Sequence, residues 1–284
     1  MTGGEVEPQL DLDAYLARIG YTGSREPKPD TLAALHLAHA QSIPFENLDV
    51  LLGRGIRLDL ASLEQKLVRD RRGGYCFEQN LLFAAVLEAL GFRVARLAAR
   101  VRLGATRVLP RTHMCVAVDV DGTLYLADVG FGAEGLYLPI PLAADQPHRQ
   151  LNSTYQLRAE TADHWVLESK RATGWFELYV FTLEPQHLSD YEVANWYVST
   201  NPQSPFTRTL TAQRLTPEAR HILRGRELIT ERDGQQQLET LADDAAVLEV
   251  LAERFGLEFP RDTRFRNEPW IDSSARGSPP IGDP

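Results

Sequence analysis

The chain has 284 residues, enough for two or three domain-sized units, and 43% of them are hydrophobic, which is typical of a globular protein with a sizeable core. Its 39 acidic and 30 basic side chains leave a formal net charge of −9. Nucleic acid and anionic membranes would repel such a chain, so we expect neither as a partner.

The N-terminus, MTGGEVEPQLDLDAYL, is acidic and lacks the basic-then-apolar pattern of a secretory signal. No segment approaches the roughly 18 consecutive apolar residues that a membrane-spanning helix needs. These two features predict a cytoplasmic protein.

Residues 10 to 90 have the apolar spacing of helices. Side chains at Leu12, Tyr15, Leu16 and Ile19 follow the i, i+3, i+4, i+7 pattern of one face of an amphipathic helix. Four helices are predicted, over residues 10–19, 32–40, 60–68 and 75–90, with Thr31 as the N-cap of the second and Gly91 ending the fourth.

From residue 92 the hydrophobic period changes from 3.6 to two. Strands are predicted over residues 92–103, 113–120, 123–129, 155–158, 164–169 and 175–182, separated by Gly, Pro, Asp and Asn. So many short strands indicate a closed or nearly closed sheet. A helix is predicted over 243–255, and the Pro-, Gly- and Ser-rich end is predicted to be unstructured.

Only two cysteines are present, Cys76 and Cys115. A reducing cytosol disfavours a disulfide, and no C-x-x-C spacing predicts zinc, so we expect no metal. Cys76 follows Gly73 and Gly74 and lies in the first turn of the helix predicted over 75–90, where unpaired N–H groups and the helix dipole favour an anion such as a thiolate. Cys76 is either a nucleophile or an inert buried residue, and its position alone leaves both open. Cys115 has no such surroundings, and we expect it to pack in the core.

A hairpin is predicted between the strands 113–120 and 123–129, because Asp-Gly at 121–122 is the strongest short hairpin signal. A two-residue turn places His113 and Asp128 on one face as diagonal neighbours, about 7–8 Å apart at Cα and within reach of a hydrogen bond. His113 could then serve as a base that Asp128 orients. The alternative is that His113 is an ordinary strand residue and that Asp128 caps a loop.

Cys76, His113 and Asp128 together would supply a nucleophile, a base and an orienting carboxylate. That set suggests acyl transfer or amide hydrolysis.

The sequence closely resembles the arylamine N-acetyltransferase family. Five stretches carry the resemblance: IPFENLDVLLG at 43–53, RRGGYCFEQN at 71–80, RTHMCVAV at 111–118, DVGFG at 128–132 and NWYVSTNPQSPF at 195–206. They are long and in order, and the likeness covers roughly residues 10 to 210. One departure is Ala133, which stands where a further glycine is frequent in the family.

The resemblance implies an α+β fold of several domains, with a catalytic core similar to that of papain-like and transglutaminase proteins. A helical bundle over 1–91 would carry the cysteine, a β-barrel over 92–206 would carry the histidine and aspartate, and an α/β lid would span 207–268. Residues 269–284 would be a disordered tail.

The resemblance also implies site residues. The triad would be Cys76, His113 and Asp128. Substrate and CoA would contact residues of the barrel, its loop and the following motif: Val101, Gly130, Phe131, Gly132 and Phe206. Four further motif residues are expected to have structural roles at the cysteine turn, either in a buried ion pair or by bracing its backbone: Glu46, Arg72, Glu78 and Asn80.

Members of this family move an acetyl group from acetyl-CoA to an arylamine, arylhydrazine or arylhydroxylamine through an acetyl-cysteine. We therefore expect acetyl-CoA as a substrate, a small aromatic amine or hydrazine as the acceptor and no tightly bound cofactor. Two alternatives remain: an amide synthase that closes a polyketide ring, and a transglutaminase-like cysteine hydrolase. The sequence does not predict the oligomeric state.

Overall fold

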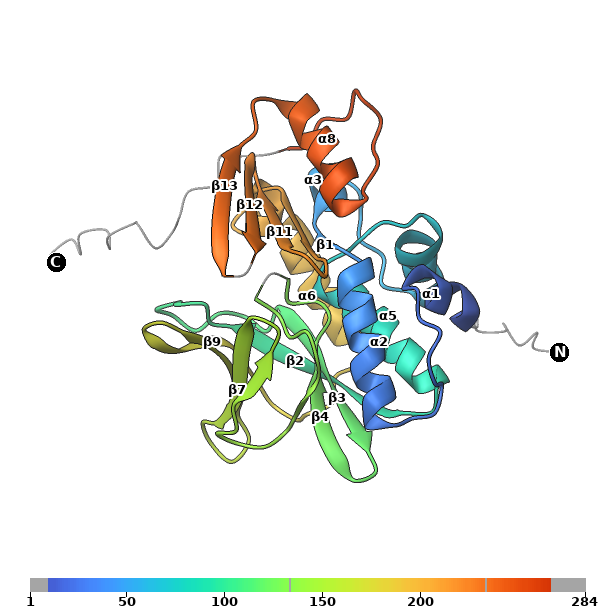
Figure 1. Ribbon diagram of the computed structural model, residues 1–284, viewed down its shortest axis with the longest axis vertical. Helices are drawn as coiled ribbons and strands as arrows, with labels where there is room; N and C mark the ends of the chain where they lie inside the picture. Colours follow the sequence, from blue (N-terminus) through green and yellow to red (C-terminus); the bar gives the residue numbers. More distant parts are fainter. Residues whose placement is uncertain (1–9, 133, 233, 267–284) are drawn as a thin grey trace, which may run out of the picture.

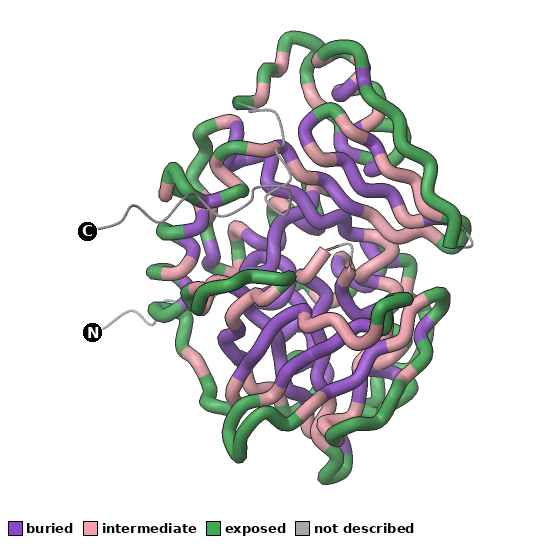
Figure 2. Tube along the Cα trace, turned by 90° about the vertical axis from the view of Figure 1, so that its left-hand side faces the viewer, coloured by how far each residue is buried: buried purple, intermediate pink, exposed green. Residues whose placement is uncertain are grey.

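The computed structural model describes residues 10–132, 134–232 and 234–266, so the predicted tail 269–284 and Ala133 lie outside the described residues. Three parts pack together: a group of helices, a curved sheet that forms a nearly closed barrel, and a second sheet with a helix (Figure 1). The fold is α+β. Buried backbone concentrates inside these parts, and exposed backbone lies mainly at the loops (Figure 2).

The first part contains the predicted helices. They are α1 (Leu12–Arg18), α2 (Pro29–Ser42), α3 (Leu48–Leu51), α4 (Leu60–Leu63), a π-helical turn η1 (Glu64–Arg69) and α5 (Cys76–Ala89). The N-cap prediction for Thr31 was wrong. Lys28 is the N-cap, and the helix begins at Pro29, whose fixed φ suits the first helical position.

Helix α5 is the centre of the largest apolar core. Eleven of its residues are buried, among them Phe77, Leu82, Phe83 and Leu87, so the helix is covered on nearly all sides. A helix that is apolar all round belongs in the interior of a large domain. This packing fixes the first turn of α5, where Cys76 stands.

The curved sheet has eight strands within the described residues, in the order β5-β4-β3-β2-β9-β8-β7-β6, and all neighbours are antiparallel. The strands are β2 (Arg93–Val101), β3 (His113–Val120), β4 (Thr123–Ala127), β5 (Ile140–Pro141), β6 (His148–Gln150), β7 (Ser153–Ala159), β8 (Trp165–Arg171) and β9 (Gly174–Phe181). The six predicted strands are confirmed within a few residues. The two short ones, β5 and β6, were not predicted.

The predicted hairpin register is confirmed. Val120 pairs with Thr123, and Val116 pairs with Ala127 in the same register. The turn between the strands has positive φ at both of its residues, 121 and 122, which Asp-Gly tolerates and most residue pairs do not. Asp128 follows directly after β4, at the end of the strand that faces the start of β3.

The C-terminal part contains α6 (Leu188–Thr200), α7 (Pro205–Arg208), β10 (Thr211–Leu215), β11 (Arg220–Arg224), β12 (Glu227–Arg232), β13 (Gln235–Thr240) and α8 (Asp244–Phe255). The range 92–206, predicted as barrel alone, therefore also contains α6 and the start of α7. The second sheet has the order β1-β10-β11-β12-β13, and β1 (Phe45–Glu46) comes from the N-terminal part of the chain. This pairing of β1 with β10 joins the N-terminal helical part to the second sheet.

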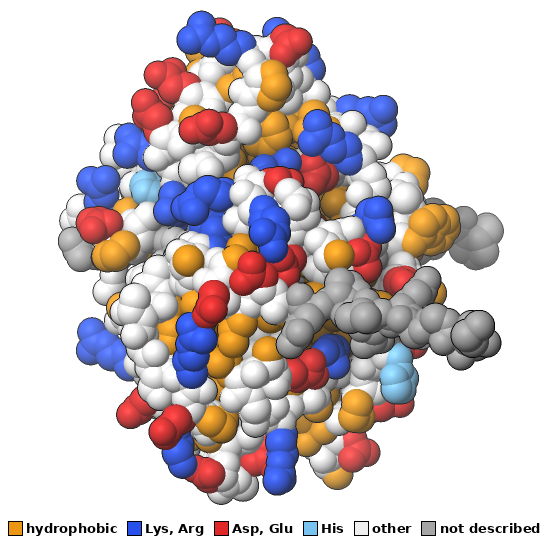
Figure 3. All heavy atoms as spheres, turned by 90° about the vertical axis from the view of Figure 1, so that its right-hand side faces the viewer, with side chains coloured by type: hydrophobic (Ala, Val, Ile, Leu, Met, Phe, Trp, Pro, Cys, Tyr) orange, Lys and Arg blue, Asp and Glu red, His pale blue; other side chains and the backbone are white. Residues whose placement is uncertain are grey.

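Charged side chains of both signs alternate over the face seen from the right of Figure 1 (Figure 3). Ion pairs among the described residues include Arg69 with Glu64 and Arg25 with Asp13. Among the described residues, no helix has the length and apolar character needed to cross a membrane.

Leu82 tests the central role of α5. It is fully buried in the largest core, so Leu82→Ala should lower the free energy of unfolding by about 2–5 kcal/mol. The control is Val193→Ala on α6, where the side chain is 71% exposed and the change should stay within about 0.5 kcal/mol. Urea unfolding of both variants measures the difference. Equal losses would contradict the assignment of α5 as the core helix.

Candidate active site

Cys76 is the first residue of α5 and is 4% exposed. The turn before it needs glycine because of close packing. A Cβ atom on Gly73 would lie 2.1 Å from the carbonyl oxygen of Pro44, and one on Gly74 would lie 2.8 Å from the carboxylate of Glu78. The same carboxylate accepts the backbone N–H of Tyr75 at 3.0 Å. The Cys76 thiol is thus held at a helix N-terminus, where the dipole favours an anion.

His113 and Asp128 form a buried pair. His113 Nε2 lies 2.7 Å from Asp128 Oδ2, and the two side chains are 3% and 0% exposed. The imidazole packs against two aromatic rings, with centroid distances of 5.0 Å to Phe131 and 4.9 Å to Tyr179, and these two rings also pack on each other. The hydrogen bond expected from the hairpin register is present.

The second carboxylate oxygen of Asp128 is also satisfied. Oδ1 accepts from Asn80 Nδ2 and from the backbone N–H of Gly130, both at 2.9 Å. The carbonyl of the Asn80 side chain accepts the N–H of Val129 at 3.1 Å. Burial by itself would raise the pKa of Asp128, but the charge of His113 and these hydrogen bonds outweigh it and lower the pKa. Asp128 is therefore a carboxylate in the folded protein.

The interaction with Asp128 raises the pKa of His113. Burial disfavours the imidazolium, yet the charge and hydrogen bond of Asp128, together with a contact from Cys76, raise the pKa of His113 from 6.5 to about 10. At neutral pH the imidazole is therefore cationic, beside a cysteine and a carboxylate.

The other cysteine differs, because burial raises the pKa of the fully buried Cys115 thiol well above its usual value. It packs in the barrel core, as expected.

An ion network underlies the cysteine turn. Arg72 contacts Glu46 at 2.7 Å and Asp49 at 3.2 Å, and Lys66 contacts Asp49 at 2.8 Å and Glu78 at 2.6 Å. The ion pair expected for Glu46 and Arg72 is present. Because Glu46 and Glu78 are almost fully buried, removing a cation would leave an uncompensated charge beneath the cysteine turn.

A pocket of about 420 Å³ opens above Cys76 and His113. Its lining includes four of the five predicted binding residues: Val101, Gly130, Phe131 and Phe206. Its volume lies in the range of small-molecule sites, and most of its neighbours are apolar or aromatic. The structure thus brings a cysteine and a histidine to the floor of a ligand-sized cavity.

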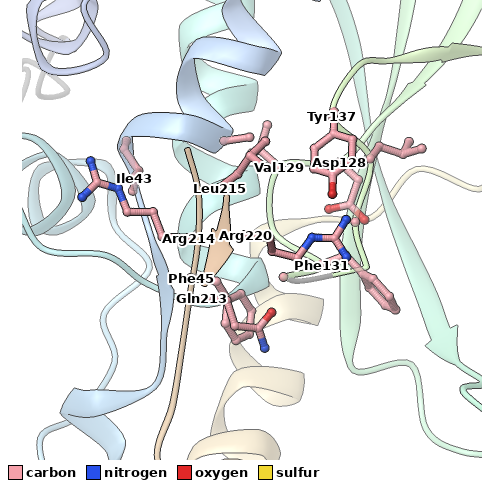
Figure 4. A pocket seen from close by; sticks show the side chains of 14 residues that line it. Ile43, Phe45, Asp128, Val129, Phe131, Tyr137, Gln213, Arg214, Leu215 and Arg220 are labelled. Atoms are coloured by element: carbon pink, nitrogen blue, oxygen red, sulfur yellow. The ribbon is translucent and has the colours of Figure 1, made fainter. Parts of the chain in front are cut away.

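Gly132 does not line this pocket. It has a φ of +87° and faces Gln213 in a smaller neighbouring cavity of about 40 Å³, which shares Phe131 and Gln213 with the larger one. Arg220 reaches into this cavity from the second sheet and lies over the ring of Tyr137 at 5.3 Å (Figure 4). The contact of Gly132 with CoA stays a prediction.

The sequence reasoning missed two contributors. Asn80 was expected only to brace the cysteine turn, but its side chain reaches Asp128; its position four residues after Cys76 on one helix face was a usable signal. Tyr179 packs on His113 from β9, and nothing in the local sequence pointed to it. No group of three or more His, Cys, Asp or Glu side chains is arranged to hold a metal in the part of the chain that the structure describes.

Comparison with known proteins shows the family of the chain. The model of a family described as N-acetyltransferase matches residues 29–264. An arylamine N-acetyltransferase from Mycolicibacterium smegmatis is 43% identical over 255 residues, which cover 88% of this chain and 92% of the relative. The solved structure of arylamine N-acetyltransferase from Salmonella typhimurium has a TM-score of 0.85 at 36% identity, covering 88% of this chain and 94% of that one. The enzyme from Mycobacterium marinum, solved in complex with CoA, has a TM-score of 0.82 at 39% identity and covers 87% and 92%.

The protein is thus an acyltransferase. These matches are long and of high identity, so they also identify the family: the chain belongs to the arylamine N-acetyltransferase family.

Gly130 tests the packing between the Asp128 loop and α5. A Cβ atom there would lie 2.7 Å from Cys76 Cα and 2.7 Å from Asn80 Nδ2, so Gly130→Ala must displace the loop or the helix. We expect a loss of about 1–3 kcal/mol in the free energy of unfolding. Gly55→Ala is the control, because no atom lies within 4 Å of its added Cβ. Thermal unfolding compares the two, and equal stability would show that the loop is not closely packed on α5.

Proposed function

We propose that this enzyme transfers an acetyl group from acetyl-CoA to an arylamine, arylhydrazine or arylhydroxylamine by a ping-pong mechanism through an acetyl-cysteine at Cys76. The observation that carries the proposal is the buried His113–Asp128 pair next to Cys76 on the floor of one ligand-sized pocket. The CoA complex of the Mycobacterium marinum relative supports acetyl-CoA as the donor.

In the first half-reaction, the Cys76 sulfur attacks the thioester carbonyl of acetyl-CoA. The tetrahedral intermediate collapses with loss of the CoA sulfur, which takes its proton from the His113 imidazolium. Asp128 stabilises that imidazolium and holds the ring in orientation. Exchange of one thioester for another is nearly isoenergetic, so this step is readily reversible.

In the second half-reaction, the amine attacks the acetyl carbonyl on Cys76. Neutral His113 takes the proton that the nitrogen loses, and the Cys76 sulfur departs with the bonding electron pair. The product is an amide, or an ester when the acceptor reacts through a hydroxylamine oxygen. Because an amide is more stable than a thioester, this step drives the transfer forward.

The acceptor would lie in the apolar part of the pocket. Phe206 packs on Phe45 and Tyr75, with centroid distances of 5.9 and 5.8 Å, and Phe131 packs on His113. These rings form walls against which a flat aromatic substrate can stack, beside Val101 and Gly130.

Intact mass tests the acetyl-cysteine. After mixing with acetyl-CoA, the protein should gain one acetyl group at Cys76, and adding an arylamine should remove it. No acetylation would contradict the donor assignment. Loss of the acetyl group at the same rate without an amine would favour a hydrolase instead.

The controls for that experiment are the two cysteine variants. Cys76→Ser should abolish labelling, whereas Cys115→Ser should keep it, because Cys115 is fully buried in the barrel core. Labelling that persists in Cys76→Ser would place the nucleophile elsewhere.

Phe206→Ala tests the acceptor wall. The second-order rate constant for transfer from acetyl-Cys76 to an arylamine should fall about 10–100-fold, since an apolar contact is lost in the pocket. Acetylation by acetyl-CoA should fall less. The matched control is Trp196→Ala, which changes an aromatic side chain that is 68% exposed and does not line the pocket. Stopped-flow kinetics of each half-reaction separates the effects, and equal losses in both would contradict an acceptor role.

A further inference from the structure

A second buried histidine lies directly behind the candidate triad. His36, in α2, is 0% exposed, and both of its ring nitrogens contact the loop that follows β4. The backbone N–H of Asp128 donates to His36 Nε2 at 3.1 Å, and His36 Nδ1 lies 3.0 Å from the carbonyl oxygen of Tyr137. One side chain therefore holds both ends of the loop from residue 128 to residue 137.

These contacts determine the protonation of His36. An amide N–H can donate only to a nitrogen lone pair, so Nε2 is unprotonated and Nδ1 carries the proton that it donates to Tyr137. Asp128 and, on the same helix, His39 are the titratable groups that act on the ring. From α5, the ring of Phe83 packs against it at 5.7 Å. Burial lowers the pKa of His36 to about 4, so the ring is neutral at pH 7.

The loop needs such an anchor because it is rich in glycine. Gly130, Gly132 and Gly135 lie between its two ends, and Gly132 has positive φ. Without His36, the N–H of Asp128 would be left unsatisfied inside the protein, which favours a shift of the backbone. Any such shift moves the carboxylate that holds His113.

We propose that His36 is a positioning residue for acetyl transfer: by accepting the backbone N–H of Asp128, it fixes the carboxylate and, through it, the orientation of His113. This inference rests on the proposed function, because it concerns the rate of the same reaction. His36 touches neither substrate nor the reacting atoms.

Two substitutions separate the contacts of His36. A glutamine can place its amide oxygen near the position of Nε2, so His36→Gln keeps an acceptor for Asp128. An asparagine reaches only to the position of Nδ1, so His36→Asn keeps a donor for Tyr137 and loses the contact with Asp128. Both variants replace the ring by a neutral amide, so the two variants have the same polarity.

His39 provides the control position. It is equally buried and one turn further along α2, but its nitrogens contact Gln79 Oε1 at 3.0 Å and the hydroxyl of Tyr15 at 2.8 Å. It makes no hydrogen bond with the Asp128 loop in the described structure. His39→Asn therefore measures the general cost of an amide in the core beneath α2.

The experiment is the single-turnover acetylation of Cys76 at saturating acetyl-CoA, with amide hydrogen exchange of Asp128 as a second readout. We expect His36→Gln to react within about threefold of the wild type and to keep the Asp128 amide protected. His36→Asn should react about 100-fold more slowly, since displacement of a catalytic group by 1 Å can cost that much, and its Asp128 amide should exchange fast. His39→Asn should stay close to the wild type in both readouts.

Equal rates for His36→Gln and His36→Asn would overturn the proposal, as would an equal slowing in His39→Asn. If His36→Asn does not fold, His36→Gln decides: a folded variant slowed 100-fold contradicts the positioning role, and a near-normal rate with a protected Asp128 amide supports it. A failure of the proposed function is distinct, because the wild type itself would then not be acetylated, while the exchange of the Asp128 amide would still report on its anchor.

Discussion

The hydrogen bond between His113 and Asp128 is the interaction on which the rest of the site depends. A buried carboxylate is costly unless a cation and several hydrogen-bond donors compensate it. Here the cation is His113, and the donors come from Asn80 on α5 and from the backbone of the loop itself. Compensating one charge therefore requires the helix and the barrel to meet at one point. That requirement places Cys76, at the start of the same helix, beside the imidazole.

The cysteine turn is held by a second, independent set of charges. A network of ion pairs lies beneath it, formed by Arg72, Lys66, Glu46, Asp49 and Glu78. Strand β1 joins the same region to the C-terminal sheet. The two sets have different tasks. The network braces the turn that carries Cys76, whereas the His113–Asp128 pair sets the protonation of the imidazole. The pocket above them has apolar walls from α7 and from the barrel loop, which also carries Asp128.

The sequence predicted the contact between His113 and Asp128 because that contact depends on a single hairpin. The Asp-Gly turn at 121–122 was sufficient for the hairpin register and hence for the pairing of His113 with Asp128. Helix α6 was missed because its buried face includes the polar Asn195, while Val193 and Trp196 are exposed, which hides the helical period. The hairpin of β12 and β13, in which Arg232 pairs with Gln235, was also missed, although the sequence has the Asp-Gly signal directly after Arg232. The packing of Tyr179 on His113 and of Gly132 on Gln213 is tertiary, so local sequence patterns do not predict it.

The central claim is that Asp128 keeps His113 cationic inside the protein. The most direct measurement follows the His113 ring nitrogens by NMR as the pH is raised, in the wild type and in Asp128→Asn. We predict an imidazolium at pH 8 in the wild type that loses its proton near pH 10, because the carboxylate outweighs the effect of burial. In Asp128→Asn burial acts without that charge, so the proton should leave at or below the ordinary value of 6.5. A wild-type His113 that is already neutral at pH 8 would contradict the account.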